Sequence, residues 1–437
     1  MNGARMQKSK IHYGWWIVAG CFIITCTTIP LIIALFNKFL IPVTREMGVS
    51  RSSFTLANTI AQALGIFISP YIAKKLSTGN FKRIVTLGMI GYCASYASYG
   101  FAQNIWHMYA SSVVFGICFL IIAMIPLSMM ATNWFVKKRG LALSIIFSGI
   151  GLGGFIFSPL LTYFLTNYGW RMSYFIMAGI AFAVTMPVCV FILQKRPEDI
   201  GMKPYGAEDA GTQAVSSAPA AKAVTLSVKN SYHTLFFKIL IISAVTNGLI
   251  NIGALGQFPP ALEEMYGAAF QAKIIALYSI FGFAGKLSLG WINDRYGLIP
   301  SCAAGCVTFG SAFLFMLAGG SETSMYIMSV IFGFGIAIGS VSLPLVTSAI
   351  YGSEKYGEAF GMVNSAFQVG LTFGSIMVAG IFDVTGSYAP AWMLLLVLTG
   401  VTLAGWIGSY LMSRPYCPGG EKAQIPTDTG NFAPSEV

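Results

Sequence analysis

Apolar runs of about twenty residues constrain the fold of this chain more than any other feature of its sequence. Twelve such runs begin near Tyr13, Phe54, Ile84, Trp106, Leu141, Trp170, Leu235, Ile274, Pro300, Met325, Gly357 and Ala389. A helix of that length crosses the hydrocarbon core of a bilayer, whereas a barrel strand needs only about ten residues of alternating polarity. Only 9% of the 437 residues are charged, against about 25% in a soluble domain. We therefore expect an all-α membrane protein with twelve transmembrane helices.

Lysine and arginine residues gather in the short loops on one side of these predicted spans. The clearest basic loops, between runs two and three and between runs four and five, hold Lys74, Lys75, Lys82, Arg83, Lys137, Lys138 and Arg139. Basic loops of membrane proteins usually face the cytoplasm. We expect a multi-pass protein of the plasma membrane with both termini in the cytoplasm. The net charge of +11 follows this loop pattern, so nucleic acid is not an expected partner.

A change of composition divides the chain into two sets of six runs. Between Arg196 and His233 the residues are small, polar and unpatterned, which is typical of a flexible linker. The expected domains are an N-terminal six-helix bundle (1–196), a cytoplasmic linker (197–233), a C-terminal six-helix bundle (234–413) and a cytoplasmic tail (414–437).

The two halves also repeat weakly. The spacing from Gly140 to Gly169 equals the spacing from Gly357 to Gly386, and a single offset along the chain relates the first pair to the second. A parallel repeat of six-span bundles is typical of transporters that bind their substrate near the membrane midplane, between the halves.

One lysine, Lys286, lies inside the eighth apolar run. Charges return only eight residues later, at Asp294, so Lys286 lies about 12 Å inside the cytoplasmic end of a helix that rises about 1.5 Å per residue. That depth is close to the midplane, where a charged lysine costs at least about 2.5 kcal/mol. We expect Lys286 to bind a substrate anion. The structural alternative is a lysine that reaches back to the cytoplasm or packs on backbone carbonyls.

Two pairs of amide side chains offer further candidates for substrate binding. Asn364 and Gln368 lie one helical turn apart in the eleventh run, and Asn247 and Asn251 lie one turn apart in the seventh. Asn364 and Gln368 could hydrogen-bond a carboxylate or its water, and they could equally hold helices together. Asn247 and Asn251 share a helix face and are weaker candidates for lining the cavity.

Residue types that carry other chemistry are absent from the predicted midplane. The acidic residues and the three histidines fall near the ends of the runs, and none of the eight cysteines forms a CxxC pair. No phosphate-binding loop or Ser/His/Asp set lies near the membrane core. We expect no metal, no cofactor and no enzymatic activity, and we expect the cysteines to be small buried apolar residues.

The stretch "GWINDRYG" resembles the G-x-x-x-D-R-x-G motif that follows span eight in the major facilitator superfamily. Its residues are Gly290, Asp294, Arg295 and Gly297. The resemblance implies the major facilitator fold, with two six-helix bundles, and a gating role for these four residues. The plainer alternative is that the charges only set the topology of a loop. The first-half copy, "PYIAKKLSTGNFKR", is degraded and has Lys74 or Lys75 where the acid is expected.

Further stretches resemble the oxalate/formate and monocarboxylate transporter group of that superfamily. They are "HYGWWIV", "NWFVKKRGLALSI", "NYGWR" and "KRPEDIGMKPYG". Members of this group place a cation, usually Arg, eight residues before the motif Asp to bind a carboxylate, and Lys286 has this spacing. The oxalate transporters carry a second cation where this chain has Val363, and the mammalian monocarboxylate transporters carry an Asp where it has Gly282. The resemblance therefore implies a substrate with one carboxylate. The Asp that would pair with the span-eight cation in proton symport is missing.

These inferences together predict a secondary active or facilitative transporter of a small organic anion, in particular a monocarboxylate, that works by alternating access. The coupled species is a proton (symporter) or a counter-anion (antiporter), and the missing acid favours exchange. An alternative is a major facilitator efflux carrier for hydrophobic or drug-like compounds, which would need an acid near the midplane. A sensor derived from a carrier would need an added cytoplasmic domain. We expect a monomer in the lipid bilayer.

Overall fold

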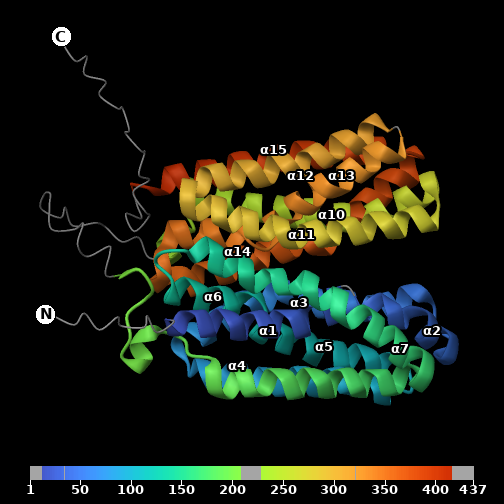
Figure 1. The fold of residues 1–437 in the computed structure, drawn as a ribbon, viewed down its shortest axis with the longest axis horizontal. Coiled ribbons are helices and arrows are strands. Elements are labelled where there is room, and N and C mark those ends of the chain that lie inside the picture. The colour runs from blue at the N-terminus through green and yellow to red at the C-terminus, as the bar shows by residue number, and fades with distance from the viewer. Residues whose placement is uncertain (1–11, 34, 208–227, 320, 416–437) are drawn as a thin grey trace, which may run out of the picture.

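The computed structural model describes residues 12–33, 35–207, 228–319 and 321–415. Helices form almost all of this part of the chain, and each predicted apolar run lies in one helix or in consecutive helical segments (Figure 1). The α-helices are α1 (Tyr13–Ile33), α2 (Leu40–Met47), α3 (Arg51–Thr78), α4 (Phe81–Ser98), α5 (Ile105–Ile122), α6 (Met124–Trp134), α7 (Arg139–Pro187), α9 (Val228–Ser231), α10 (Leu235–Tyr266), α11 (Ala268–Tyr296), α12 (Leu298–Ala318), α13 (Glu322–Gly335), α14 (Ser342–Thr385) and α15 (Ala389–Ser413). Short 3₁₀ or π turns are η1 (Phe36–Phe39), η2 (Tyr99–Phe101), η3 (Val188–Ile192), η4 (Pro197–Ile200) and η5 (Ile336–Gly339).

Nine helical segments of the described residues are long and apolar enough to cross a membrane. The two longest, Arg139–Ile192 and Glu322–Thr385, are each interrupted by a glycine with positive φ, Gly169 at 73° and Gly352 at 64°. Glycine adopts this conformation without a steric penalty, so each segment can hold two of the predicted runs. The predicted all-helical membrane fold is confirmed. The count of twelve spans stays a prediction, since α4 holds a run but is not among the nine.

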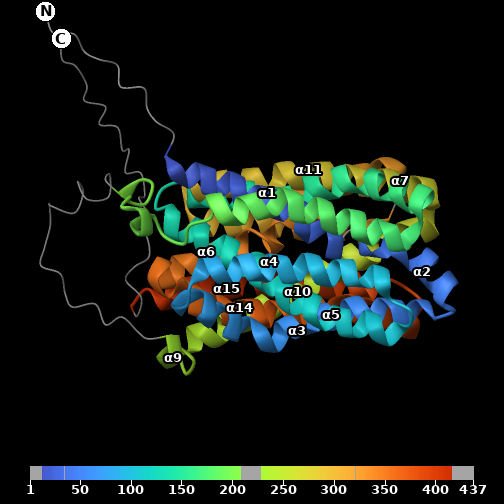
Figure 2. The same ribbon diagram turned by 90° about the horizontal axis from the view of Figure 1, so that it is seen from below.

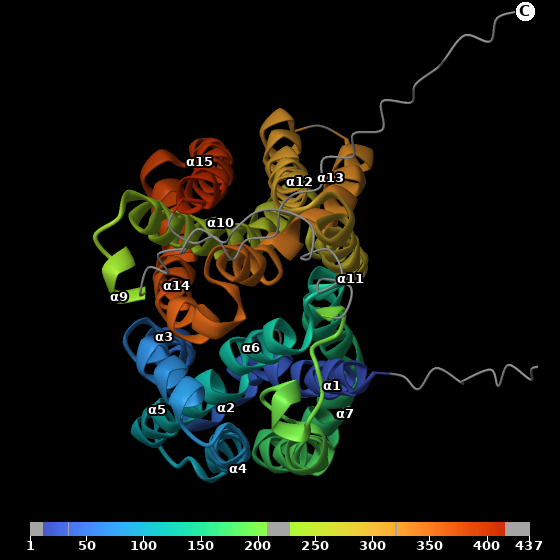
Figure 3. The same ribbon diagram turned by 90° about the vertical axis from the view of Figure 1, so that its left-hand side faces the viewer.

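The helices run along the long axis of the molecule and form two bundles (Figures 1 and 2). The N-terminal bundle contains α1 to α7 and the C-terminal bundle contains α10 to α15 (Figure 3). The bundles meet where α3 packs on α14 and where α7 packs on α11. These two helix pairs are called the α3/α14 crossing and the α7/α11 crossing below.

The predicted repeat is visible in the backbone. Gly169 and Gly386, which the repeat relates, both have positive φ, at 73° and 67°. The repeat therefore places a glycine of positive φ after the fifth and the eleventh predicted run, although ψ differs, at 172° for Gly169 and 12° for Gly386.

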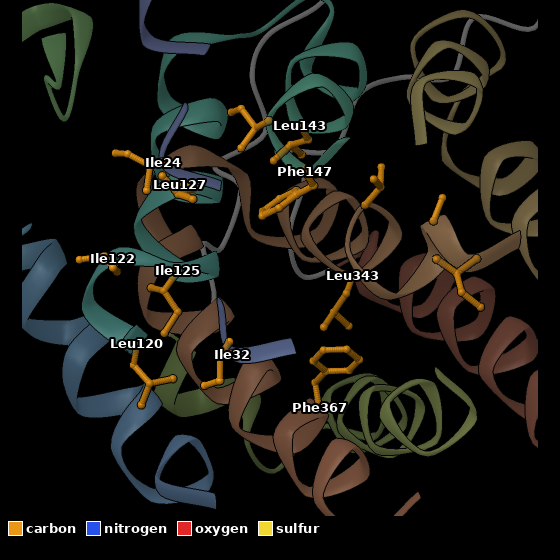
Figure 4. Close-up of a cluster of buried hydrophobic side chains, with 14 of the residues drawn as sticks. Ile24, Ile32, Leu120, Ile122, Ile125, Leu127, Leu143, Phe147, Leu343 and Phe367 are labelled. Atoms are coloured by element: carbon orange, nitrogen blue, oxygen red, sulfur yellow. The ribbon is translucent and has the colours of Figure 1, made fainter. Parts of the chain in front are cut away.

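Apolar side chains fill both bundles and the boundary between them. Figure 4 shows part of this core, with residues from α1, α5, α6, α7 and α14 in one cluster. Phe147 of the N-terminal bundle and Leu343 of the C-terminal bundle both belong to it and are fully buried. The two bundles therefore share an apolar boundary, and polar groups on that boundary need a specific reason to be there.

The first part of the predicted linker is docked on the N-terminal bundle. Tyr205 N–H donates to the carbonyl of Trp134 at 2.8 Å, and Val136 N–H donates to the carbonyl of Tyr205 at 3.1 Å. The Tyr205 ring also packs edge-on against the rings of His12 and Trp15. The middle of the linker (208–227) and the tail from residue 416 lie outside the described residues. The four domain limits stay predictions.

Small residues let helices approach closely within the N-terminal bundle. A Cβ atom on Gly153 of α7 would collide with the backbone carbonyl of Cys26 and the ring of Pro30 on α1. Gly179, further along α7, has no such neighbour within 4 Å. Close approach at small residues is a main source of helix association in lipid.

We predict that Gly153→Leu lowers the thermal unfolding midpoint of the purified protein markedly. Overpacking of a tight contact costs about 1–3 kcal/mol or more. Scanning fluorimetry in detergent would measure the midpoint. Gly179→Leu, in the part of α7 that follows the break at Gly169, is the control and should unfold near the wild-type temperature. Equal midpoints for the two variants would contradict the packing role of Gly153.

Candidate functional site

Lys286 lies on α11 and is buried. Among the residues that the structure describes, it is the one charged side chain classed as buried, with 8% of its surface exposed. The side chain therefore does not extend to solvent at the end of α11. It packs on a backbone carbonyl, as the other part of the structural alternative predicts. Its ammonium group stays inside the protein, at the boundary between the bundles.

The Lys286 ammonium donates one hydrogen bond to the protein. Nζ donates to the backbone carbonyl of Phe147 on α7 at 3.1 Å, which joins the two bundles at the α7/α11 crossing. A lysine ammonium has three donors, and no carboxylate of the described chain pairs with it. Burial of a charge without a counter-charge is unfavourable. Two donors and the whole positive charge are thus available to an anion.

Acidic side chains lie away from this position. No Asp or Glu is buried in the part of the chain that the structure describes. Glu46, on α2, is half exposed and forms an ion pair of 3.1 Å with Arg171. The carboxylates therefore leave the charge of Lys286 uncompensated.

Asn364 and Gln368 lie on α14 and face α3, at the other crossing between the bundles. Asn364 Nδ2 donates to Ser69 Oγ at 3.1 Å, and Gln368 Nε2 donates to the carbonyl of Gln62 at 3.4 Å. Both side chains are buried. The structure thus places these amides in contacts that hold the two bundles together, separate from the bond that Lys286 makes.

Asn247 and Asn251 lie on α10, inside the C-terminal bundle. Asn251 Nδ2 donates to the backbone carbonyl and to Oδ1 of Asn247, both at 2.9 Å. Asn251 also packs against Gly339, where a Cβ atom would collide with it. The Nδ2 group of Asn247 is buried and has no partner in the described chain. This pair stabilises the packing of α10 on η5, and no contact brings it to Lys286.

Asp294 joins the bundles at one end of the α7/α11 crossing. Its Oδ1 accepts from Gly140 N–H at 2.7 Å, and its Oδ2 accepts from Leu141 N–H at 2.8 Å. These are first-turn N–H groups of α7, which have no partner within their own helix. A carboxylate there satisfies both donors and interacts favourably with the helix dipole. Asp294 is therefore a cap on α7 supplied by the opposite bundle.

The other motif residues have local roles. Gly290 lies against Gly140, where a Cβ atom would collide with the backbone. Gly297 has a φ of 90° and separates α11 from α12. The Arg295 guanidinium lies 5.5 Å from the ring centroid of Trp291 and 5.7 Å from that of Tyr296. The motif thus contacts the opposite bundle through Asp294 and Gly290.

The repeat relates the two crossings residue by residue. The offset that separates Gly140 from Gly357 also relates Phe147 to Asn364 and Ser69 to Lys286. Lys286 is hydrogen-bonded to Phe147 at one crossing, and Asn364 is hydrogen-bonded to Ser69 at the other. The sequence did not predict Phe147 as the partner of Lys286 or Ser69 as the partner of Asn364. The offset alone could have identified Ser69 as the counterpart of Lys286.

The same offset corrects the position expected for the first-half acid. Ser77, and not Lys74 or Lys75, is the counterpart of Asp294, because it contacts Gly357 as Asp294 contacts Gly140. The Ser77 carbonyl accepts a hydrogen bond from Lys195 Nζ, and burial lowers the pKa of Lys195. Because serine has no carboxylate, the α3/α14 crossing has no cap from Ser77 that corresponds to the cap from Asp294.

The described residues contain no ligand set of a metal site and no disulfide pair. No group of three or more His, Cys, Asp or Glu side chains could hold a metal there. The seven described cysteines are free thiols, five of them buried. Cys417 lies outside the described residues.

Comparisons with known proteins find similar membrane transporters. The family model of the Major Facilitator Superfamily matches residues 15–375 and 240–426. Monocarboxylate transporter 12 of Mus musculus is 23% identical over 408 residues, which cover 87% of this chain and 82% of that protein. Monocarboxylate transporter 4 of Rattus norvegicus is 25% identical over 407 residues, covering 87% and 80%.

Solved structures show the same fold. The human organic anion transporter MFSD10 (TETRAN) superposes with a TM-score of 0.61 at 14% identity, covering 91% of this chain and 98% of that one. The transporter FucP in its outward conformation superposes with a TM-score of 0.65 at 14% identity, covering 90% and 97%.

We predict that Asp294→Ala opens the α7/α11 crossing at the Asp294 end. Loss of a helix cap costs about 0.5–2 kcal/mol, which converts to a shift of about 2- to 30-fold between open and closed states. The reporter is a single cysteine at Ser144, which is fully buried beside Gly290, in a cysteine-free background. Its labelling by a membrane-impermeant maleimide should accelerate from the side of the membrane that holds Asp294, which the sequence predicts to be the cytoplasmic side. A cysteine at the exposed Thr78 should label at an unchanged rate, and an unchanged rate at Ser144 as well would contradict the gating role.

Proposed function

Since the chain belongs to the major facilitator superfamily, we propose that it carries small organic anions, with monocarboxylates as its substrates, by alternating access. It is a multi-pass membrane transporter related to the monocarboxylate transporters, and not an enzyme. The proposed location is the plasma membrane, with both termini in the cytoplasm.

The observation that carries this proposal is the uncompensated charge of Lys286. An anion that binds Nζ would satisfy the remaining donors and remove the cost of an unpaired buried charge. Lysine presents a compact point charge and lacks the planar fork of arginine, so one carboxylate is a suitable partner. The names of the relatives, monocarboxylate transporters 12 and 4, support the same substrate class.

The position of Lys286 also suggests how binding and movement are linked. Its bond to the Phe147 carbonyl connects the bundles, and a substrate carboxylate would compete with that carbonyl for the ammonium. Binding would therefore weaken one of the contacts that hold the α7/α11 crossing. The Asp294 cap at the end of that crossing would then break as the bundles rock.

In this scheme the amide residues support the site without being its main ligands. Asn364 and Gln368 hold the α3/α14 crossing through neutral hydrogen bonds, and Asn247 with Asn251 fixes α10 within its bundle. Each can still turn toward a bound carboxylate or its water when the bundles move. Arg295, Gly290 and Gly297 shape the loop that presents Asp294.

The alternative, an efflux carrier for hydrophobic or drug-like compounds, has less support. A carrier of cationic drugs would need a buried acid, and no buried Asp or Glu occurs in the described residues. A buried lysine instead repels a cation.

We predict that Lys286→Gln abolishes carboxylate transport while protein expression and folding stay near wild type. Lys286→Arg should retain part of the activity, because it keeps the charge with a different geometry. The assay is counterflow of a labelled monocarboxylate into liposomes that hold the purified protein. Lys273→Gln is the matched control, since Lys273 is exposed on the same helix. Uptake by Lys286→Gln at the wild-type rate would refute the proposal.

A second prediction concerns coupling. Because Lys286 has no buried carboxylate partner among the described residues, uptake should respond strongly to an anion on the opposite side of the membrane and weakly to a pH gradient. The same liposomes, preloaded with or without unlabelled carboxylate, would measure both responses. Strong accumulation that a protonophore removes would show proton symport, with Lys286 as the first candidate for the proton carrier.

A further inference from the structure

One helical turn beyond Lys286, the two crossings differ in the size of the side chain that lies between their helices. At the α3/α14 crossing, Gln368 follows Asn364 by one turn and bonds to the carbonyl of Gln62. The repeat places Gly151 at the position of Gln368 and Ser279 at the position of Gln62. The α3/α14 crossing therefore has the long side chain of Gln368 where the α7/α11 crossing has the glycine Gly151.

The surroundings of these positions show that the difference is one of space. Gln368 fills its crossing, because a Cβ atom on the facing Gly65 would collide with the Gln368 side chain. A Cβ atom on Gly151 would meet only the carbonyl oxygen of Ser279, at 3.8 Å. The repeat partner of Gly65 is Gly282, also a glycine. The Ser279 hydroxyl on α11 donates to the carbonyl of Ile275 within its own helix. The α7/α11 crossing thus lacks the long side chain that fills the other crossing at this level.

Helix geometry puts this space next to the ammonium of Lys286. In an α-helix the carbonyl of one residue points toward the N–H group four residues later. The Phe147 carbonyl therefore points toward Gly151, and Nζ, which donates to that carbonyl at 3.1 Å, lies beside the turn between them. The buried cation and the space beside Gly151 are adjacent parts of one surface.

We propose that Gly151 sets the size of the substrate that Lys286 accepts. The carboxylate binds Nζ, and the carbon body of the substrate lies over Gly151, between α7 and α11. A Cβ atom on Gly282 would meet the Ile336 side chain at 3.3 Å and the Gly333 carbonyl at 3.7 Å, so Ile336 supplies an apolar contact there. The ligand class is monocarboxylates with an apolar body, in preference to oxalate, whose second charge would meet no second buried cation in the described chain. This inference rests on the proposed function.

The test is a competition series in proteoliposomes. Counterflow of labelled butyrate is inhibited by acetate, butyrate, hexanoate, phenylacetate and oxalate, each over a range of concentrations. For the wild type we expect hexanoate and phenylacetate to compete better than oxalate. Gly151→Leu should weaken competition by hexanoate and phenylacetate at least about tenfold, because their body would overlap the new side chain. Competition by acetate should change less than about twofold.

Two further variants make the result decisive. Gly151→Ala should give a smaller shift in the same order, and it covers the case in which Gly151→Leu does not fold. Gly179→Leu, which lies beyond the break at Gly169 and has no neighbour within 4 Å, should keep the wild-type order. A uniform loss for all competitors with Gly151→Ala, an unchanged order with a folded Gly151→Leu, or oxalate as the best wild-type competitor would overturn the inference.

The outcome for Lys286→Gln separates this inference from the function itself. If that variant transports like the wild type, the proposed function fails, whatever the Gly151 variants do. If Lys286 is required and the Gly151 variants leave the size order unchanged, only the role of Gly151 fails.

Discussion

A positive charge held inside an apolar boundary is the constraint on which the other features of this protein depend. Lys286 is buried, and its one hydrogen bond to the described chain goes to a backbone carbonyl of the opposite bundle. That carbonyl already accepts a hydrogen bond within its own helix, so it compensates the charge only in part. The ammonium favours both the joined state of the bundles and the binding of an anion. In the proposed mechanism, competition between these two partners connects substrate binding to bundle movement.

The repeat gives the two crossings the same register and different chemistry. The α3/α14 crossing contains neutral polar contacts, between Asn364 and Ser69 and between Gln368 and Gln62. The α7/α11 crossing contains a cation, an acidic cap and a glycine. Neutral amide contacts do not depend on a charged ligand, whereas the contacts of Lys286 do. In the proposed mechanism, one crossing therefore holds the bundles together, and the other responds to the substrate.

Sequence reasoning identified the fold and the main charge because both depend on composition along the chain. Apolar run length predicts a helix, and the distance from Asp294 predicts the depth of Lys286. It could not predict that Asn364 and Gln368 face α3, because spacing along a helix does not determine its rotation about its own axis. The Phe147 carbonyl has no sequence signature, since every residue carries a carbonyl. Ser77 was missed because the local motif was matched to basic residues, whereas the offset between the two halves identifies it.

The single charge also bears on how such a carrier returns after releasing its substrate. With a monocarboxylate bound, Lys286 and its ligand form a neutral pair, and a neutral pair crosses an apolar region at lower cost than a charge. Without substrate, the ammonium is again uncompensated and its bond to Phe147 holds the bundles together. The loaded protein should therefore reorient more readily than the empty one. A carrier of this kind exchanges one carboxylate for another unless Lys286 itself loses a proton, and this places the choice between exchange and proton coupling on one side chain.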